Sequence, residues 1–249
     1  MTLTQAQRLQ LLHEGWVKVP GVVPRIMVDA ALRAINHSVG EGLDPEHLTR
    51  FRAQTFCPEL TEQPVITDMV GRTPAWELVE SVLGPARAGV PRRGQIALRF
   101  PMLADPPPHP GPHVDGTYTP ANGVKEGTLG SFTALLAVLL SDLPAENCGN
   151  FKVWPGSHRI IEKYLQEHGA QELIKGIPDL EFPPPVQITG QAGDIVLTHF
   201  QLAHSVAANV SPHIRYAVFF RVTTHDHAEH RWENLTDIWR DWPGIQALA

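Results

Sequence analysis

The chain has 249 residues, a net charge of −6 at neutral pH and 43% hydrophobic residues. This length and composition suit one globular domain with a buried core and exclude a mainly disordered chain. The mild acidity provides no basic surface for nucleic acid or for an anionic membrane, so we expect neither as a partner.

The N-terminal third is predicted to be mainly helical. Capping residues, prolines and glycines delimit three helices, at about 4–15, 24–40 and 74–84. A short apolar strand at 16–19 separates the first two helices. Residues 1–90 are therefore expected to support a core that lies further along the chain.

From residue 94 onward the pattern changes to short strands separated by glycine and proline clusters. The first and last strands alternate clearly, which places Gln95 and Arg99 on one face of the first, and Arg215 and Arg221 on one face of the last. Strands are expected at 94–100, 131–140, 150–154, 195–198 and 214–222, with a helix around 160–165.

Helices followed by many short strands predict a mainly β fold with flanking helices. We expect a double-stranded β-helix, a jelly-roll or cupin-like core, buttressed by the N-terminal helices. One domain over 1–249 is predicted, with helical support at 1–90, the jelly-roll core at 94–224 and a tail or lid at 225–249.

One short motif points to a metal. His113 and Asp115 are separated by a single residue, so on an extended strand both side chains point to the same side. His204, after a distant strand, is the best candidate for a third ligand. Two imidazoles and one carboxylate can occupy one face of an octahedral metal and leave the other face open, as in non-heme Fe(II) oxygenases.

Arg215 suggests a second ligand. It begins an apolar strand, and its guanidinium would need an anion if that strand lines a cavity, because a buried unpaired charge is costly. The planar guanidinium suits a carboxylate held by two hydrogen bonds.

Several motifs occur in a characteristic order along the chain. They are GWVKVPG at 15–21, HVDG at 113–116, GNFKVWPGSH at 149–158, Gly193-Asp194, and His204 with Asn209 and Arg215. In this ordered set the chain resembles the phytanoyl-CoA dioxygenase family of Fe(II)- and 2-oxoglutarate-dependent oxygenases.

The resemblance implies catalytic and metal-binding roles for His113, Asp115 and His204, which would hold Fe(II). It also implies that Arg215 pairs with the distal carboxylate of 2-oxoglutarate. Gln95, facing inward upstream of the motif, is expected to be a further contact to this co-substrate.

Thr133, on the long strand, is expected to contact the co-substrate as well. Two positions depart from the family pattern: Ala137 stands where many members carry tryptophan, and Val206 replaces a small polar residue.

The implied activity is a dioxygenase, specifically a hydroxylase, that uses 2-oxoglutarate and O2, releases succinate and CO2, and oxidises an unactivated C–H bond of a small-molecule metabolite. Asp115 favours hydroxylation or desaturation over halogenation, because related halogenases carry a small residue at this position. Two alternatives remain open: a non-catalytic metal-binding jelly-roll protein, and a zinc-type metallohydrolase that uses the same ligands.

Substrate specificity is expected to lie in two segments, 104–130 and 225–242, which could cover the site. The side chains expected to bind substrate are Arg99, Tyr118, Arg221, Trp232 and Trp239. His158, in a Pro-Gly-Ser-His turn, is expected to be structural.

A cytoplasmic protein is expected, because no apolar run approaches the roughly 20 residues that span a bilayer. Cys57 and Cys148 lack the spacing of a disulfide framework or a metal motif. The final Ala-Leu-Ala is not a peroxisomal address, which makes a general small metabolite a safer expectation than an acyl-CoA. The sequence leaves open whether the protein is a monomer or a homodimer.

Overall fold

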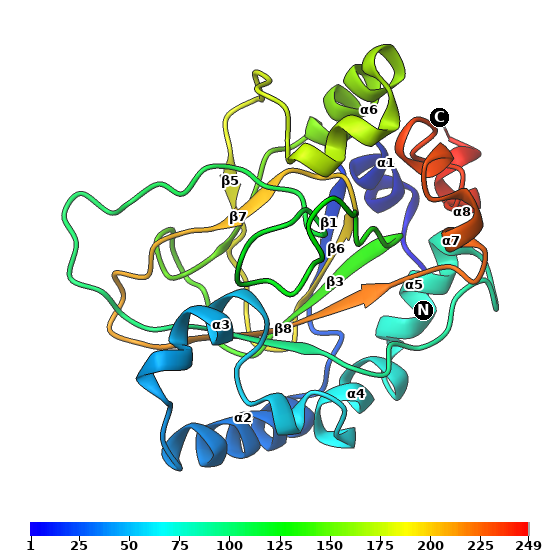
Figure 1. Cartoon of the computed structure of the whole chain (residues 1–249). Helices are drawn as coiled ribbons and strands as arrows, with labels where there is room; N and C mark the ends of the chain where they lie inside the picture. The colour runs from blue at the N-terminus through cyan, green and yellow to red at the C-terminus, as the bar shows by residue number, and fades with distance from the viewer. Residues whose placement is uncertain (249) are drawn as a thin grey trace.

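A computed structural model of the chain describes residues 1–248 and has two antiparallel sheets at its centre (Figure 1). The larger sheet has the strand order β1-β6-β3-β8-β2, and the smaller one has the order β5-β4-β7. The strands are β1 Trp16–Val19, β2 Gln95–Arg99, β3 Ala134–Leu139, β4 Phe151–Val153, β5 Val186–Gln187, β6 Ile195–His199, β7 His204–Val206 and β8 Arg215–Val222.

The helices lie outside the sheets (Figure 1). They are α1 Gln5–Glu14, α2 Arg25–Gly40, α3 Leu48–Ala53, α4 Pro64–Gly71, α5 Pro74–Leu83, α6 Ser157–His168, α7 His227–His230 and α8 Pro243–Gln246, with short 3-10 turns between some of them. The three helices predicted in the N-terminal third are confirmed, and α3 and α4 are additional. No helix within residues 1–248 has the length and apolar character that crossing a membrane requires.

Helix α1 begins and ends as its sequence predicts. The Thr4 side chain accepts a hydrogen bond from the Gln7 backbone, and the Gln7 side chain accepts one from the Thr4 backbone. Gly15 ends the helix at φ 81°, and a Cβ there would lie 2.6 Å from Nδ1 of His158. Nε2 of this buried histidine lies 3.3 Å from the Leu12 carbonyl, consistent with a structural role.

The two faces of the larger sheet have different partners. Residues such as Ile96, Leu136 and Phe220 point to the core shared with the N-terminal helices. Residues of opposite parity, such as Ala97 and Phe219, point to a second core that includes the smaller sheet and α6. The alternation predicted for β2 and β8 is therefore the division between a structural face and an interior face. This arrangement is the expected jelly-roll core with flanking helices.

The tail does not form the expected lid. Trp239 and Trp242 are 7% and 1% exposed, and both join the core shared with the N-terminal helices. Trp239 packs edge-on against His158 and His199, with ring centroids 5.5 Å and 5.1 Å apart. Its large apolar surface gains more from burial here than over a wet cavity.

Candidate metal centre

Two of the candidate ligands are fixed by backbone pairing. His113 belongs to no named strand, yet it forms an isolated bridge with His204 at the start of β7. Each backbone N–H donates to the other residue's carbonyl at 2.9 Å. Their rings lie 4.5 Å apart between centroids. The bridge therefore aims both imidazoles at one point.

Asp115 completes a three-sided cage. Its Oδ1 lies 3.6 Å from Nε2 of His113 and 3.4 Å from Nε2 of His204, and the three donor atoms lie within 4.8 Å of one another. Neighbouring donors each about 2.1 Å from one metal would be about 3 Å apart. The nitrogen and oxygen donors and their spacing thus fit a metal bound on one face, as the sequence predicts.

The tautomer of His204 suits a ligand. Its Nδ1 lies 2.8 Å from the Leu202 carbonyl, which only accepts hydrogen bonds, so Nδ1 carries the proton. Nε2 is then the ring nitrogen that faces Asp115, at 3.4 Å from its Oδ1. Orientation of one ring nitrogen by a carbonyl is usual for histidines that bind metals.

The second oxygen of Asp115 has a different partner. Arg221 Nη2 pairs with Oδ2 of Asp115 at 2.5 Å, and Arg221 Nη1 donates to Oε1 of Gln95 at 2.9 Å. Burial alone would raise the pKa of Asp115, but the two imidazoles and the guanidinium hold it well below its usual range. Asp115 is therefore ionised at neutral pH, with only Oδ1 left facing the histidines.

Arg215 lies behind the cavity wall, 2% exposed. Its Nε donates to the Gly149 carbonyl at 2.8 Å and its Nη1 to the Ala97 carbonyl at 2.9 Å, while Nη2 has no partner within the described residues. Burial, and then the nearby Arg99, lowers the pKa of Arg215 to about 9, so the guanidinium stays protonated at neutral pH. A buried cation with an unpartnered nitrogen fits an external carboxylate.

Gly149 allows the backbone to pass close to the side chain of Arg215. Its φ is 75°, and a Cβ there would lie 3.0 Å from the Cβ atoms of both Arg99 and Arg215. These two arginines are direct partners across the β2 and β8 pairing. The glycine lets its carbonyl reach Arg215 without crowding either side chain.

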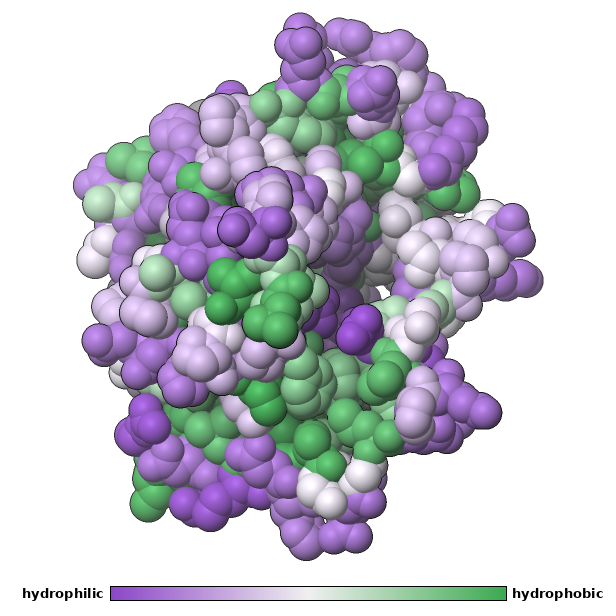
Figure 2. Space-filling model, turned by 90° about the vertical axis from the view of Figure 1, so that its left-hand side faces the viewer, coloured by the Kyte–Doolittle hydropathy of each residue, from purple (hydrophilic) through white to green (hydrophobic). Residues whose placement is uncertain are grey.

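A cavity of about 340 Å³ opens over the three candidate ligands. Strands β2, β7 and β8 line it together with α3 and the loop that carries His113, and Phe151 and Phe219 add an aromatic wall. The Phe151 ring lies 5.3 Å from that of His204 and 5.3 Å from that of Phe219. Figure 2 shows the face turned toward the irregular loops, which is hollowed near its middle; hydrophilic residues lie inside the hollow, and both hydrophobic and hydrophilic residues lie at its rim.

The other predicted residues divide into two groups. Gln95, Arg99 and Arg221 line the cavity, whereas Tyr118 is 39% exposed and does not. Trp232 and Trp239 do not line the cavity either: Trp232 packs against the second core, and Trp239 belongs to the core shared with the N-terminal helices. The expectation that the tail supplies substrate contacts is therefore corrected.

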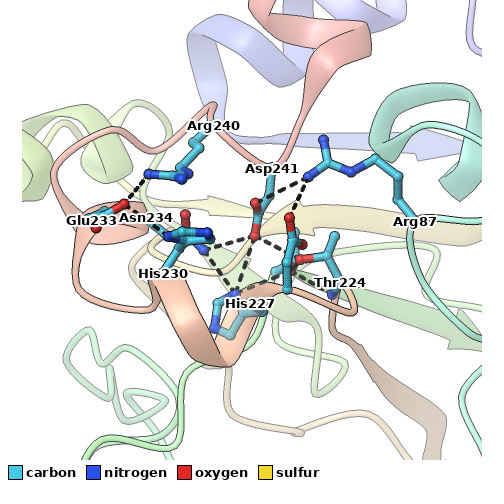
Figure 3. A network of polar contacts seen from close by, with 10 residues as sticks. Arg87, Thr224, His227, His230, Glu233, Asn234, Arg240 and Asp241 are labelled. Atoms are coloured by element: carbon cyan, nitrogen blue, oxygen red, sulfur yellow. Dashed lines mark hydrogen bonds and ion pairs between the residues drawn. The ribbon is translucent and has the colours of Figure 1, made fainter.

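Thr133 also lies elsewhere. Its Oγ1 accepts a hydrogen bond from the Thr224 backbone at 3.1 Å and lies within a buried polar network around His227 and Asp241 (Figure 3). Thr133 precedes β3, where the strand leaves the cavity, so its hydroxyl meets the tail. Its position does not support the expected contact to the co-substrate.

Arg52, Asn122 and Phe151 are among the cavity-lining residues that sequence reasoning did not single out. Phe151 could have been found from its place inside the GNFKVW motif. Arg52 had no signal of its own, because α3 is one short helix whose position depends on tertiary packing. Of the two departures from the family pattern, Val206 lines the cavity and Ala137 is buried in the second core.

Comparisons with known proteins identify the family of the chain. The family model described as phytanoyl-CoA dioxygenase (PhyH) matches residues 13–217. No curated protein matches the chain.

Solved structures share the fold at low sequence identity. The epimerase SnoN from nogalamycin biosynthesis, described as non-heme and α-ketoglutarate dependent, is 20% identical with a TM-score of 0.55, over 88% of this chain and 80% of its own. HygX from Streptomyces hygroscopicus, with nickel and 2-oxoglutarate bound, is 18% identical with a TM-score of 0.56, over 90% and 88%. The non-heme monooxygenase ThoJ is 18% identical with a TM-score of 0.59, over 88% and 77%.

Proposed function

Since the chain belongs to the phytanoyl-CoA dioxygenase family of Fe(II)- and 2-oxoglutarate-dependent oxygenases, we propose that it hydroxylates an unactivated C–H bond of a small-molecule metabolite. The observation that carries the site assignment is the convergence of three donor atoms, from His113, Asp115 and His204, within 4.8 Å of one another. We assign these residues as the iron ligands.

The charge and orientation of the ligands support this assignment. Asp115 is ionised, and the hydrogen bond between Nδ1 of His204 and the Leu202 carbonyl orients the ring so that Nε2 faces Asp115. Arg221 occupies the outer oxygen of Asp115, so the carboxylate offers the metal one oxygen. The opposite face opens into the cavity, which leaves space for small ligands.

Arg215 is assigned to the distal carboxylate of 2-oxoglutarate. The unpartnered Nη2 and the absence of a paired carboxylate among the described residues support this role. Gln95 acts indirectly, by accepting a hydrogen bond from Arg221.

Iron and 2-oxoglutarate, when bound, supply the oxidising chemistry, in which O2 is consumed and succinate and CO2 are released. The residues of the chain hold the ligands in position and limit the access of water. Phe151 and Phe219 keep water from the space beside His204, and the His113–His204 bridge keeps the imidazoles in place while substrate enters and leaves.

The fate of the substrate can be tested by isotope labelling. The purified protein would be incubated with Fe(II), 2-oxoglutarate and ¹⁸O2 and screened with metabolites for stimulated succinate release. Hydroxylation predicts a product that gains one oxygen atom carrying the label. A product that has lost two hydrogens, or has an unchanged mass as in epimerisation, would overturn hydroxylation while keeping the oxygenase class.

The same assay separates the two alternatives. A metallohydrolase would add oxygen from water and release no succinate. A non-catalytic metal-binding protein would bind metal but would not consume 2-oxoglutarate with any compound.

A further inference from the structure

A second hollow continues from the metal cavity. It measures about 460 Å³ and shares seven lining residues with the first, among them Asp115, Asn122 and Arg221. The two hollows are therefore one continuous space that leads from the candidate ligands toward Arg92 and Arg93, in the segment before β2.

The charged residues that line this space are mainly positive, whereas the whole protein has a net negative charge. Asp115 is the single acidic residue lining it, and Asp115 pairs with Arg221. Four further arginines line the space, and none of them has a carboxylate partner within the described residues: Arg52, Arg92, Arg93 and Arg99. A chain with a net charge of −6 thus gathers unpaired positive charge around one cavity.

Two of these arginines, Arg52 and Arg99, repel each other across the first hollow. Arg52, on α3, is near enough to Arg99 that, after burial, it lowers the pKa of Arg99. Like charges that a fold holds together around a concave site create a field that attracts and concentrates anions. Guanidinium groups also match the geometry of carboxylates and phosphates.

The co-substrate does not use this charge in the proposed function. We assign 2-oxoglutarate to Arg215, which lies behind the wall and lines neither hollow. Bound Fe(II) and 2-oxoglutarate carry opposite charges of equal size. Arg92 and Arg93, in the outer hollow, therefore remain unneutralised in the loaded site.

We propose that the substrate carries a carboxylate or phosphate group that binds Arg92 and Arg93 at the mouth of the cavity. This inference rests on the proposed function, because it places the C–H bond to be oxidised over the metal and the anionic group at the outer end. Arg52 and Arg99 line the inner hollow together with the candidate ligands and add to the positive field that attracts the anion.

The test uses protein saturated with Ni(II) and 2-oxoglutarate, so that the Arg215 site is filled. Hexanoate, hexyl phosphate and hexanol would be titrated by calorimetry. These probes share one chain and differ in the head group. We expect an anionic probe to bind about tenfold or more tightly than hexanol, and the preferred head group distinguishes carboxylate from phosphate.

The double variant Arg92→Gln/Arg93→Gln should weaken binding of the preferred probe about tenfold. Arg159→Gln, which removes an exposed unpaired arginine on α6, is the matched control and should leave binding unchanged. Melting temperatures would establish that each variant is folded.

Equal binding of hexanol and the anions, absence of anion binding, or wild-type affinity in the double variant would overturn the inference. Failure of the proposed function has a different signature. In that case the loaded protein binds the anionic probe through Arg92 and Arg93, but no metabolite stimulates succinate release.

Discussion

His113 and His204 are far apart in the sequence but face each other as a hydrogen-bonded antiparallel pair, with both backbone bonds at 2.9 Å. The candidate metal site is therefore built on backbone pairing, and its side chains can be substituted while the backbone framework stays in place. Because the backbone framework does not depend on these side chains, the ligand assignment can be tested by substitution.

Asp115→Ala and His204→Ala should each weaken Ni(II) or anaerobic Fe(II) binding by about a hundredfold or more, because each removes one of three donors. Calorimetry measures the affinity, and circular dichroism checks the fold. His109→Ala is the control, since His109 is an exposed histidine on the same loop. Equal loss in the His109 variant, or wild-type affinity in the other two, contradicts the assignment.

Arg215→Lys should weaken 2-oxoglutarate binding to the Ni(II)-loaded protein by about 10- to 100-fold. Lysine keeps the charge but cannot make the paired hydrogen bonds of the guanidinium, each of which contributes about 1.5–3 kcal/mol when charged. Metal affinity should be unchanged, because Arg215 contacts none of the three candidate ligands. A parallel loss of metal affinity would indicate a structural role instead.

Asp241→Asn should destabilise the fold by about 3 kcal/mol, because it leaves a buried network incomplete. Asp241 is 3% exposed and accepts hydrogen bonds of 2.8 Å from both Thr224 and Asn234 (Figure 3). Chemical denaturation measures the change. Glu233→Gln, in the same figure, removes exposed pairs and should cost less than about 1 kcal/mol.

Acid should destabilise the protein through His199. Burial is the main reason that its pKa is lowered from 6.5 to about 4. Of the charged groups nearby, Asp241 raises this pKa and His227 lowers it. Below about pH 6.5 this histidine binds a proton in the unfolded chain but not in the folded one. The free energy of unfolding therefore falls as the pH is lowered and is about 3 kcal/mol smaller at pH 4.

His199→Gln should flatten this pH dependence in denaturation curves measured at pH 7.5 and 4.5. Glutamine retains a donor for the Ile238 carbonyl but does not titrate. His37→Gln, at a position where the side chain is 82% exposed, should leave the pH dependence as in the wild type. An unchanged slope in the His199 variant would exclude this residue as the source.

Local patterns predicted the interior face of the sheet well. Period-two alternation on β2 and β8 identified Gln95, Arg99 and Arg221 as cavity residues, because one face of each strand is buried against the helices. The capping box of α1 and the glycine that ends it are equally local, and both are observed.

Features that depend on docking between distant segments could not be predicted. The tail was expected to cover the site, but Trp239 and Trp242 are buried beside His199, and Thr133 joins the polar network there. Arg52 reaches the cavity only because α3 packs at its edge. No spacing in the sequence encodes these positions.

The loop between β2 and β3 carries His113 and Asp115, yet His113 pairs with β7 through one isolated bridge. Most of that loop can therefore vary in length and composition without changing the register that aims the imidazoles. The proposed chemistry and the choice of substrate would then depend on different parts of this chain. Loops grafted before residue 113 and after the Gly116–Gly130 contact could change the substrate while the candidate ligands keep their positions.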